Sequence, residues 1–177
     1  MMHLRFNETE IGTWVLHSQG DADLVAAHDS LLEHAQDDWL VREIVLFWKR
    51  TLKRLDVSSR SLIALVEPGS CFAGTLLEIV LAADRAYMLD GVFEGSNLPA
   101  ATLRLTPLNF GPYPMGNGLT RLQTRFLAEP SKVDELKDEI GKPLDAQAAE
   151  EAGLVTFAPD DIDWEDEVRL EIGRAHV

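Results

Sequence analysis

The fold is decided by one stretch of the chain, Leu62-Ile-Ala-Leu-Val-Glu-Pro-Gly-Ser-Cys-Phe-Ala-Gly-Thr-Leu-Leu-Glu-Ile-Val-Leu-Ala-Ala-Asp84. It opens with an apolar run at residues 62–66, which is typical of a buried strand. The run ends at Pro68-Gly69, and a turn of small residues then leads into an apolar helix expected at residues 75–83. This helix carries a single carboxylate, Glu78, so the stretch predicts a strand, a tight turn and a helix with one acidic group.

The start of this helix is a candidate place for a developing negative charge. Gly74 allows a sharp bend into the helix, whose first N–H groups have no partner within it and lie at the positive end of the dipole. Such donors stabilise an oxyanion, for example a thioester enolate. Glu78 lies on the same face and leans back toward the helix start, so it could reach the same atom. A solvated or salt-bridged Glu78 stays open as the alternative reading.

Composition bounds the class of protein. The chain has 177 residues, 46% of them hydrophobic, which predicts one globular domain over residues 1–177 with a sizeable core. Its net charge of −14 argues against nucleic acid and against an anionic membrane surface as partners. No apolar run approaches the ~20 residues that span a bilayer, and the N-terminus has no secretory apolar region. A lone cysteine, Cys71, fits a reducing compartment, so we expect a cytoplasmic protein.

Apolar patterns along the chain alternate between the period of a strand and that of a helix. This alternation argues for an α/β fold with right-handed crossovers. Strands are expected at 11–17, 62–66, 86–89, 102–105 and 154–157, and helices at about 21–33, 40–55, 75–83, 119–127, 131–140 and 145–152, with a Gly- and Pro-rich loop at 109–118.

Three segments in the same order resemble the crotonase (enoyl-CoA hydratase/isomerase) superfamily. They are Val66–Asp84, the Gly-Pro-rich turn and following helix at Phe110–Leu122, and the Ala-rich helix ending in Gly-Leu-Val at Gly141–Val155. The resemblance implies a partial crotonase-like ββα superhelix, a cytoplasmic oligomer, and an acyl-CoA thioester as substrate with no separate cofactor. Within this family, the amino-acid sequence is most similar to ring-cleaving lyases or hydrolases, which act on epoxidised (dihydrodiol) benzoyl-CoA in aerobic benzoate degradation.

The resemblance also assigns roles to individual residues. Glu78 matches the first catalytic glutamate of the family, and Thr75 matches the residue whose N–H supplies one oxyanion donor. Val25-Ala-Ala-His-Asp29 corresponds to the turn that supplies the second donor, which places the N–H of His28 there. Substrate contacts are expected from neighbouring and later residues: Cys71, Phe72, Gly74, Tyr113, Pro114 and Gly116.

The chain departs from the family pattern at its second glutamate, which falls near Thr106 or Pro107. Neither residue can do acid–base work, so hydratase activity is not expected. The family's outer strands and C-terminal helices are also missing, and this absence predicts a fragment that forms a homo-oligomer or pairs with another crotonase-like domain. A catalytically silent scaffold or oligomerisation domain is the alternative function.

Two charged segments lie outside these motifs. A basic stretch over Arg42–Arg60 is either a solvated helix face or a docking place for phosphates or another protein segment. The acidic stretch Asp160–Glu167 is expected to be a solvated terminus or contact surface, because it lacks calcium-loop spacing. His17, His28 and His34 are not at ligand spacing, so no metal site is expected.

Overall fold

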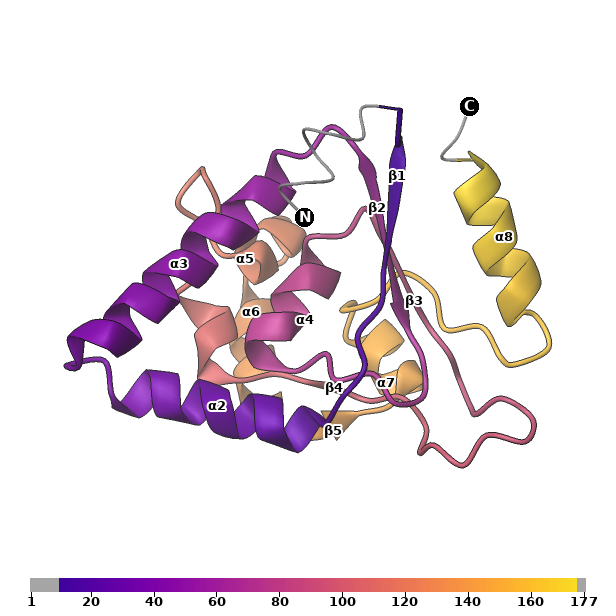
Figure 1. The fold of residues 1–177 in the computed structure, drawn as a ribbon, viewed down its shortest axis with the longest axis horizontal. Helices are drawn as coiled ribbons and strands as arrows, with labels where there is room; N and C mark the ends of the chain where they lie inside the picture. Colours follow the sequence, from indigo (N-terminus) through magenta and orange to yellow (C-terminus); the bar gives the residue numbers. More distant parts are fainter. Residues whose placement is uncertain (1–9, 175–177) are drawn as a thin grey trace.

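The computed structural model describes residues 10–174. A short parallel sheet stands at one side of the molecule, and helices lie on both of its faces (Figure 1). In chain order the elements are β1 (Thr13–Leu16), α2 (Ala22–His34), α3 (Trp39–Asp56), β2 (Ser61–Val66), α4 (Gly74–Leu81), β3 (Arg85–Met88), β4 (Leu103–Arg104), η1 (Pro107–Phe110), α5 (Arg121–Arg125), α6 (Ser131–Glu135), η2 (Leu136–Glu139), β5 (Pro143–Leu144), α7 (Ala146–Glu151) and α8 (Trp164–Arg174). The predicted α/β class is confirmed.

The parallel sheet has the order β1-β2-β3, with β2 in the centre. Thr13 is paired with Ser61 and Ile63 with Arg85 in its ladders. Because β2 is covered on both faces, its apolar run is continuous rather than alternating. A second, two-stranded antiparallel sheet joins β4 to β5, where Leu103 faces Leu144.

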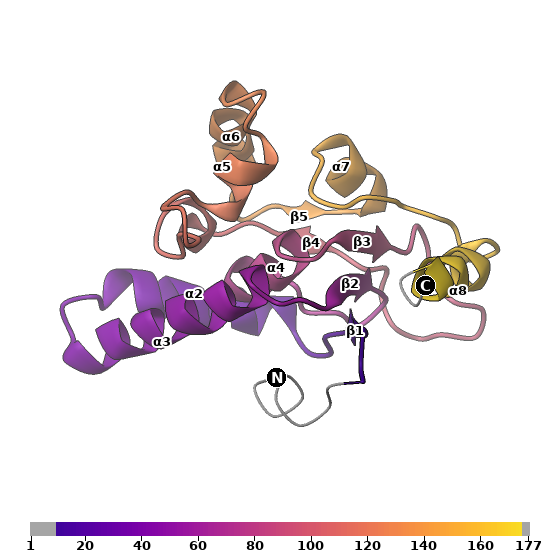
Figure 2. The same cartoon turned by 90° about the horizontal axis from the view of Figure 1, so that it is seen from above.

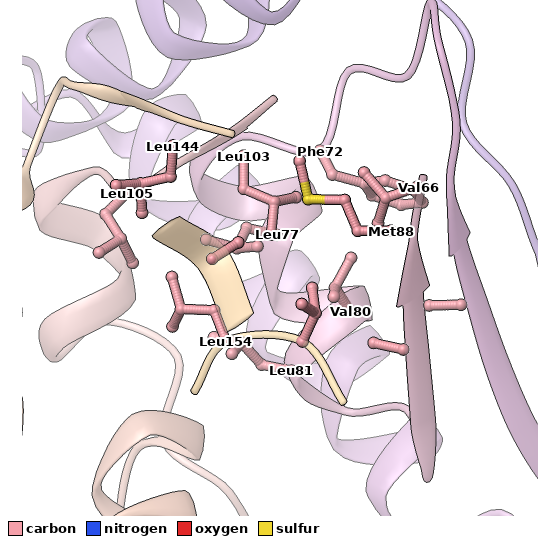
Figure 3. Packing of buried hydrophobic residues seen from close by; sticks show 14 of the residues in the cluster. Val66, Phe72, Leu77, Val80, Leu81, Met88, Leu103, Leu105, Leu144 and Leu154 are labelled. Atoms are coloured by element: carbon pink, nitrogen blue, oxygen red, sulfur yellow. The ribbon is translucent and has the colours of Figure 1, made fainter. Parts of the chain in front are cut away.

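The main hydrophobic core lies between one face of the parallel sheet, α4 and the second half of the chain. Figure 3 shows how its side chains meet from elements far apart in the sequence. Leu77 and Val80 of α4 are fully buried there. They share one hydrophobic cluster with side chains from β2, β3 and β4, so this short helix is packed on more than one side. The core therefore fixes α4 on several sides, and its labelled members are Val66, Phe72, Leu77, Val80, Leu81, Met88, Leu103, Leu105, Leu144 and Leu154.

The long helices α2 and α3 form a separate layer beside α4 (Figure 2). Asp21 and Asp38 cap their N-termini, each accepting bonds from two backbone N–H groups of the first turn. Leu52 and Leu55 of α3 are buried in a second cluster with Trp14 and Leu62 from the sheet. Residues of this layer contact the N-terminal end of α4, around Gly74 and Thr75, which we call the mouth of α4.

Two expected features differ in the structure. Residues 154–157 form no strand; Phe157 makes only an isolated bridge to Tyr87. The acidic residues at 160–167 are exposed, as expected for a solvated surface, but the segment leads into helix α8, which was not expected. Its Trp164, Val168 and Ile172 recur every four residues and pack on the outer face of the sheet. No helix within residues 10–174 is both long and apolar enough to cross a membrane.

Candidate active site at the mouth of α4

The mouth of α4 begins at Gly74, whose backbone lies in the left-handed region. Ala73 is extended and Gly74 has φ +44°, so the chain reverses into the helix at the predicted place. A Cβ on Gly74 would lie 1.7 Å from Oδ2 of Asp29 and 2.6 Å from Oγ1 of Thr106. Glycine is therefore required here both by the backbone angle and by the close approach of two other side chains.

The expected oxyanion donor is bonded to a carboxylate of the same chain. The N–H of Thr75 donates to Oδ2 of Asp29 at 2.7 Å, and the Thr75 hydroxyl donates to Oδ1 at 2.7 Å. The Thr106 hydroxyl donates to Oδ2 at 2.9 Å. Asp29 is 1% exposed, so its charge is removed from water and is balanced by these donors and by the positive end of the α4 dipole.

Tyr113 completes this group of hydroxyls. Its hydroxyl lies 3.0 Å from Oγ1 of Thr75, and because Thr75 gives its own proton to Asp29, Tyr113 is the donor. Burial raises the pKa of Tyr113 to about 12, helped by the nearby charges of Asp29 and Glu78. Tyr113 therefore stays protonated at neutral pH and can hold Thr75 in place.

Glu78 lies one turn further along α4 and is buried in a polar network. Nδ2 of Asn109 donates to its Oε1 at 2.8 Å, and Nη1 of Arg121 donates to its Oε2 at 2.7 Å. Arg121 also makes a two-pronged pair with Asp56, at 3.0 Å from Nε and 2.8 Å from Nη2. Burial raises the pKa of the Glu78 carboxyl, while Arg121 and Asn109 oppose the rise. The salt-bridged alternative thus describes Glu78 as it lies here.

A small cavity borders the Asp29 cluster. It has a volume of about 240 Å³ and lies where α2, α3 and α4 meet. Its lining is mainly apolar, from Leu24, Val25, Trp48 and Leu76. His28, Asp29 and Thr75 also border it, but Asp29 and Thr75 are only 1% and 2% exposed. The cavity is therefore an apolar hollow beside the Asp29 cluster, whose polar atoms lie beneath its lining.

The second predicted donor, His28, is misplaced. Residues 25–29 do not form a turn but lie inside α2, so the N–H of His28 is held in the helix and is not free to polarise a ligand. The chain turns earlier, between β1 and α2, where Gly20 N–H donates to the Gly69 carbonyl at 3.1 Å. The His28 side chain is half exposed and borders the cavity instead.

The predicted substrate contacts are only partly gathered. Gly74 and Tyr113 lie in the cluster described above, whereas the Phe72 side chain packs in the main core and is 1% exposed. Cys71 is buried with its N–H donating to the Ser18 hydroxyl. Pro114 is half-buried and Gly116 exposed in the loop before α5. Buried Phe72 and Cys71 leave little side-chain surface for a ligand.

Sequence reasoning missed the groups that surround Thr75 and Glu78. The spacing could have indicated that Asp29 is buried, because it follows Val25 by four residues and precedes Leu32 by three and therefore lies on the apolar face of α2. Asn109, Arg121 and Asp56 carried none, because they come from three separate elements. Across residues 10–174, no three His, Cys, Asp or Glu side chains gather as a metal site would need.

Comparison with known proteins decides the fold family. No family model matches the chain. The structure superposes on an enoyl-CoA hydratase from Geobacillus kaustophilus HTA426 with a TM-score of 0.63 at 20% identity, covering 99% of this chain and 61% of that one. An enoyl-CoA hydratase from Bacillus halodurans gives a TM-score of 0.60 at 16% identity, covering 96% and 64%. This chain has the enoyl-CoA hydratase, or crotonase, fold. The crotonase fold predicted from the three segments is confirmed.

The sequence of this crotonase-fold chain has a much nearer curated relative. It is 49% identical over 172 residues to a benzoyl-CoA-dihydrodiol lyase from Aromatoleum evansii. The match covers 97% of this chain but 30% of that lyase. The chain therefore corresponds to a segment of the lyase, spanning about a third of its length.

Proposed function

We propose that this chain is the crotonase-fold segment of a ring-cleaving lyase that acts on dihydrodiol, or epoxidised, benzoyl-CoA. The observation that carries the proposal is the 49% identity to benzoyl-CoA-dihydrodiol lyase along nearly the whole chain. The crotonase fold supports it, because the solved neighbours are named as enoyl-CoA hydratases. In this proposal CoA is part of the substrate, no further cofactor is needed, and the protein is cytoplasmic.

The mouth of α4 gives each proposed group a chemical role. The N–H of Thr75 would donate to the thioester oxygen and stabilise the charge that develops there. Glu78 would transfer a proton, and its raised pKa brings a carboxyl closer to the range useful at neutral pH. The second glutamate of a hydratase has no equivalent here, since Thr106 instead binds Asp29 and Asn109 instead binds Glu78. Ring opening rather than hydration is the chemistry that we propose.

Replacing Glu78 by Gln in the complete protein tests this role. We expect turnover of the dihydrodiol or epoxide of benzoyl-CoA to fall by a factor of ~100 or more, because an amide cannot transfer the proton. Glu43→Gln, on the exposed face of α3, is the matched control and should leave turnover unchanged. Unchanged kinetics of Glu78→Gln would remove the catalytic role.

A second function is favoured by one observation. Both polar groups that a thioester would use are already engaged, Thr75 by Asp29 and Glu78 by Arg121. The segment would then act as a scaffold that supports an active site elsewhere or mediates assembly with a second copy or another crotonase-like domain. Exposed Trp39 and Phe47 on α3, at 68% and 61%, fit such an assembly role. Glu78→Gln separates the two functions, since a scaffold would keep its turnover.

A further inference from the structure

Helix α2 is attached to the rest of the molecule by few side chains. Of its thirteen residues only Asp29 and Leu32 are buried, whereas Leu24 and Leu31 are 70% and 59% exposed. Asp23 makes an ion pair with Arg104 at the exposed edge of the helix. Because the Asp23 carboxylate is 77% exposed, water and salt screen this pair, and we expect the two buried side chains to contribute more to the attachment.

Asp29 is the stronger of these two attachments. It receives hydrogen bonds from Thr75 N–H, Thr75 hydroxyl and Thr106 hydroxyl, each at 2.7–2.9 Å. Bonds to a charged acceptor are about twice as strong as neutral ones, and they hold only while the carboxylate remains in place. A group that competes for Thr75 N–H therefore competes directly with the attachment of α2.

The cavity beside Asp29 shares its walls with α2. Leu24 and Val25 come from α2, Trp48 from α3 and Leu76 from α4. A displacement of α2 away from α4 would enlarge this cavity and free the N–H of Thr75 at the same time. The helix covers both the polar donor and the apolar space next to it.

We propose that α2 is a lid over the mouth of α4 and that Asp29 is its latch. A ligand whose carbonyl oxygen takes the Thr75 N–H displaces the Asp29 carboxylate and releases α2, and its acyl group then occupies the enlarged cavity. The class of ligand, an acyl thioester, rests on the proposed function. The lid itself rests on contacts within the chain.

Hydrogen–deuterium exchange on the full chain tests the lid without any ligand. In Asp29→Asn one of the two acceptor oxygens is replaced by an NH2 group, which cannot accept a hydrogen bond, and the negative charge that strengthens the remaining bonds is lost. We expect amides of α2 to exchange at least ~10-fold faster, equivalent to about 1.4 kcal/mol of easier opening, while α7 is unchanged. Asp23→Asn, on the same helix, is the control and should leave the exchange of α2 within about twofold.

The wild-type chain gives a second reading that needs no variant. Amides of α2 should exchange through a local opening whose rate is insensitive to low urea, whereas amides of α4 should need global unfolding. Equal opening free energies in α2 and α4, or uniform acceleration of all helices in Asp29→Asn, would overturn the lid. Neither result depends on turnover, so a failure of the proposed function leaves this test intact.

Discussion

Replacing Arg121 by leucine is expected to destabilise the fold by about 3–5 kcal/mol, the cost of removing one partner from a buried charge pair. Arg121 is 2% exposed and pairs with Glu78 and Asp56, whose side chains are 1% and 5% exposed. Without the guanidinium, Glu78 keeps only the neutral amide of Asn109, and Asp56 keeps only the weaker influence of Lys53. Urea unfolding followed by circular dichroism measures the loss.

The loss in Arg121→Leu should grow with pH. Burial already raises the pKa values of Glu78 and Asp56, and Arg121 opposes the rise in both, so its removal raises them further. A carboxyl with a raised folded pKa contributes to stability at pH values below its unfolded pKa, and the contribution is lost as pH rises through the folded pKa. The variant should therefore be closer to wild type at pH 5 than at pH 8.

An exposed arginine provides the control for this experiment. Arg169 pairs with Asp166 on α8, and its side chain is 80% exposed. Arg169→Leu should change the free energy of unfolding by less than about 0.5 kcal/mol at any of these pH values. A comparable loss of unfolding free energy in both variants would contradict the buried network. So would a loss in Arg121→Leu that becomes smaller as the pH rises.

Gly74→Ala is the second large effect, with an expected loss of about 3 kcal/mol or more. An alanine at φ +44° costs roughly 1–2 kcal/mol from the backbone alone. Its methyl group would also overlap Oδ2 of Asp29, so the carboxylate must leave its donors, and each such bond to a charge contributes about 1.5–3 kcal/mol. Thermal and urea unfolding of the full chain measure the total.

A double variant separates these two causes. Adding Asp29→Gly removes the nearer of the two side chains that the methyl group meets and leaves Thr106 in place, so Gly74→Ala should cost less in that background than in wild type but more than the backbone angle alone. Gly116→Ala is the control, because Gly116 is exposed and nothing lies within 4 Å of an added Cβ. Strict additivity of the Gly74 and Asp29 changes would show that the two residues do not meet.

Local sequence patterns predicted the elements better than they predicted the site. The strand at residues 62–66, the reversal at Gly74 and the long helix ending near Leu55 follow from apolar periodicity and glycine, and the structure has all three. Helix α8 was missed because its acidic composition hid a stripe of Trp164, Val168 and Ile172. Residues 154–157 read as a strand, yet they add only a single bridge at the sheet edge.

The site was harder because its partners are far apart in the chain. Thr75 and Glu78 could be singled out from one helix, but Asp29 lies 46 residues before Thr75 and Arg121 lies 43 after Glu78. Which carboxylate fills the mouth of α4 depends on how the layer of α2 and α3 packs on the body. The prediction that the N–H of His28 is a free donor was wrong. It assumed a turn at residues 25–29, but α2 begins at Ala22 and includes these residues.

The most direct measurement is a titration of the ¹⁵N-labelled chain with benzoyl-CoA, observed at the amide of Thr75. We expect a large shift of this resonance as the thioester replaces Asp29, broadening of the amides of α2, and tighter binding in Asp29→Asn, where no carboxylate competes. Coenzyme A alone should leave the Thr75 amide unmoved. A Thr75 resonance that stays in place while benzoyl-CoA binds, or an absence of binding in both proteins, would contradict this expectation.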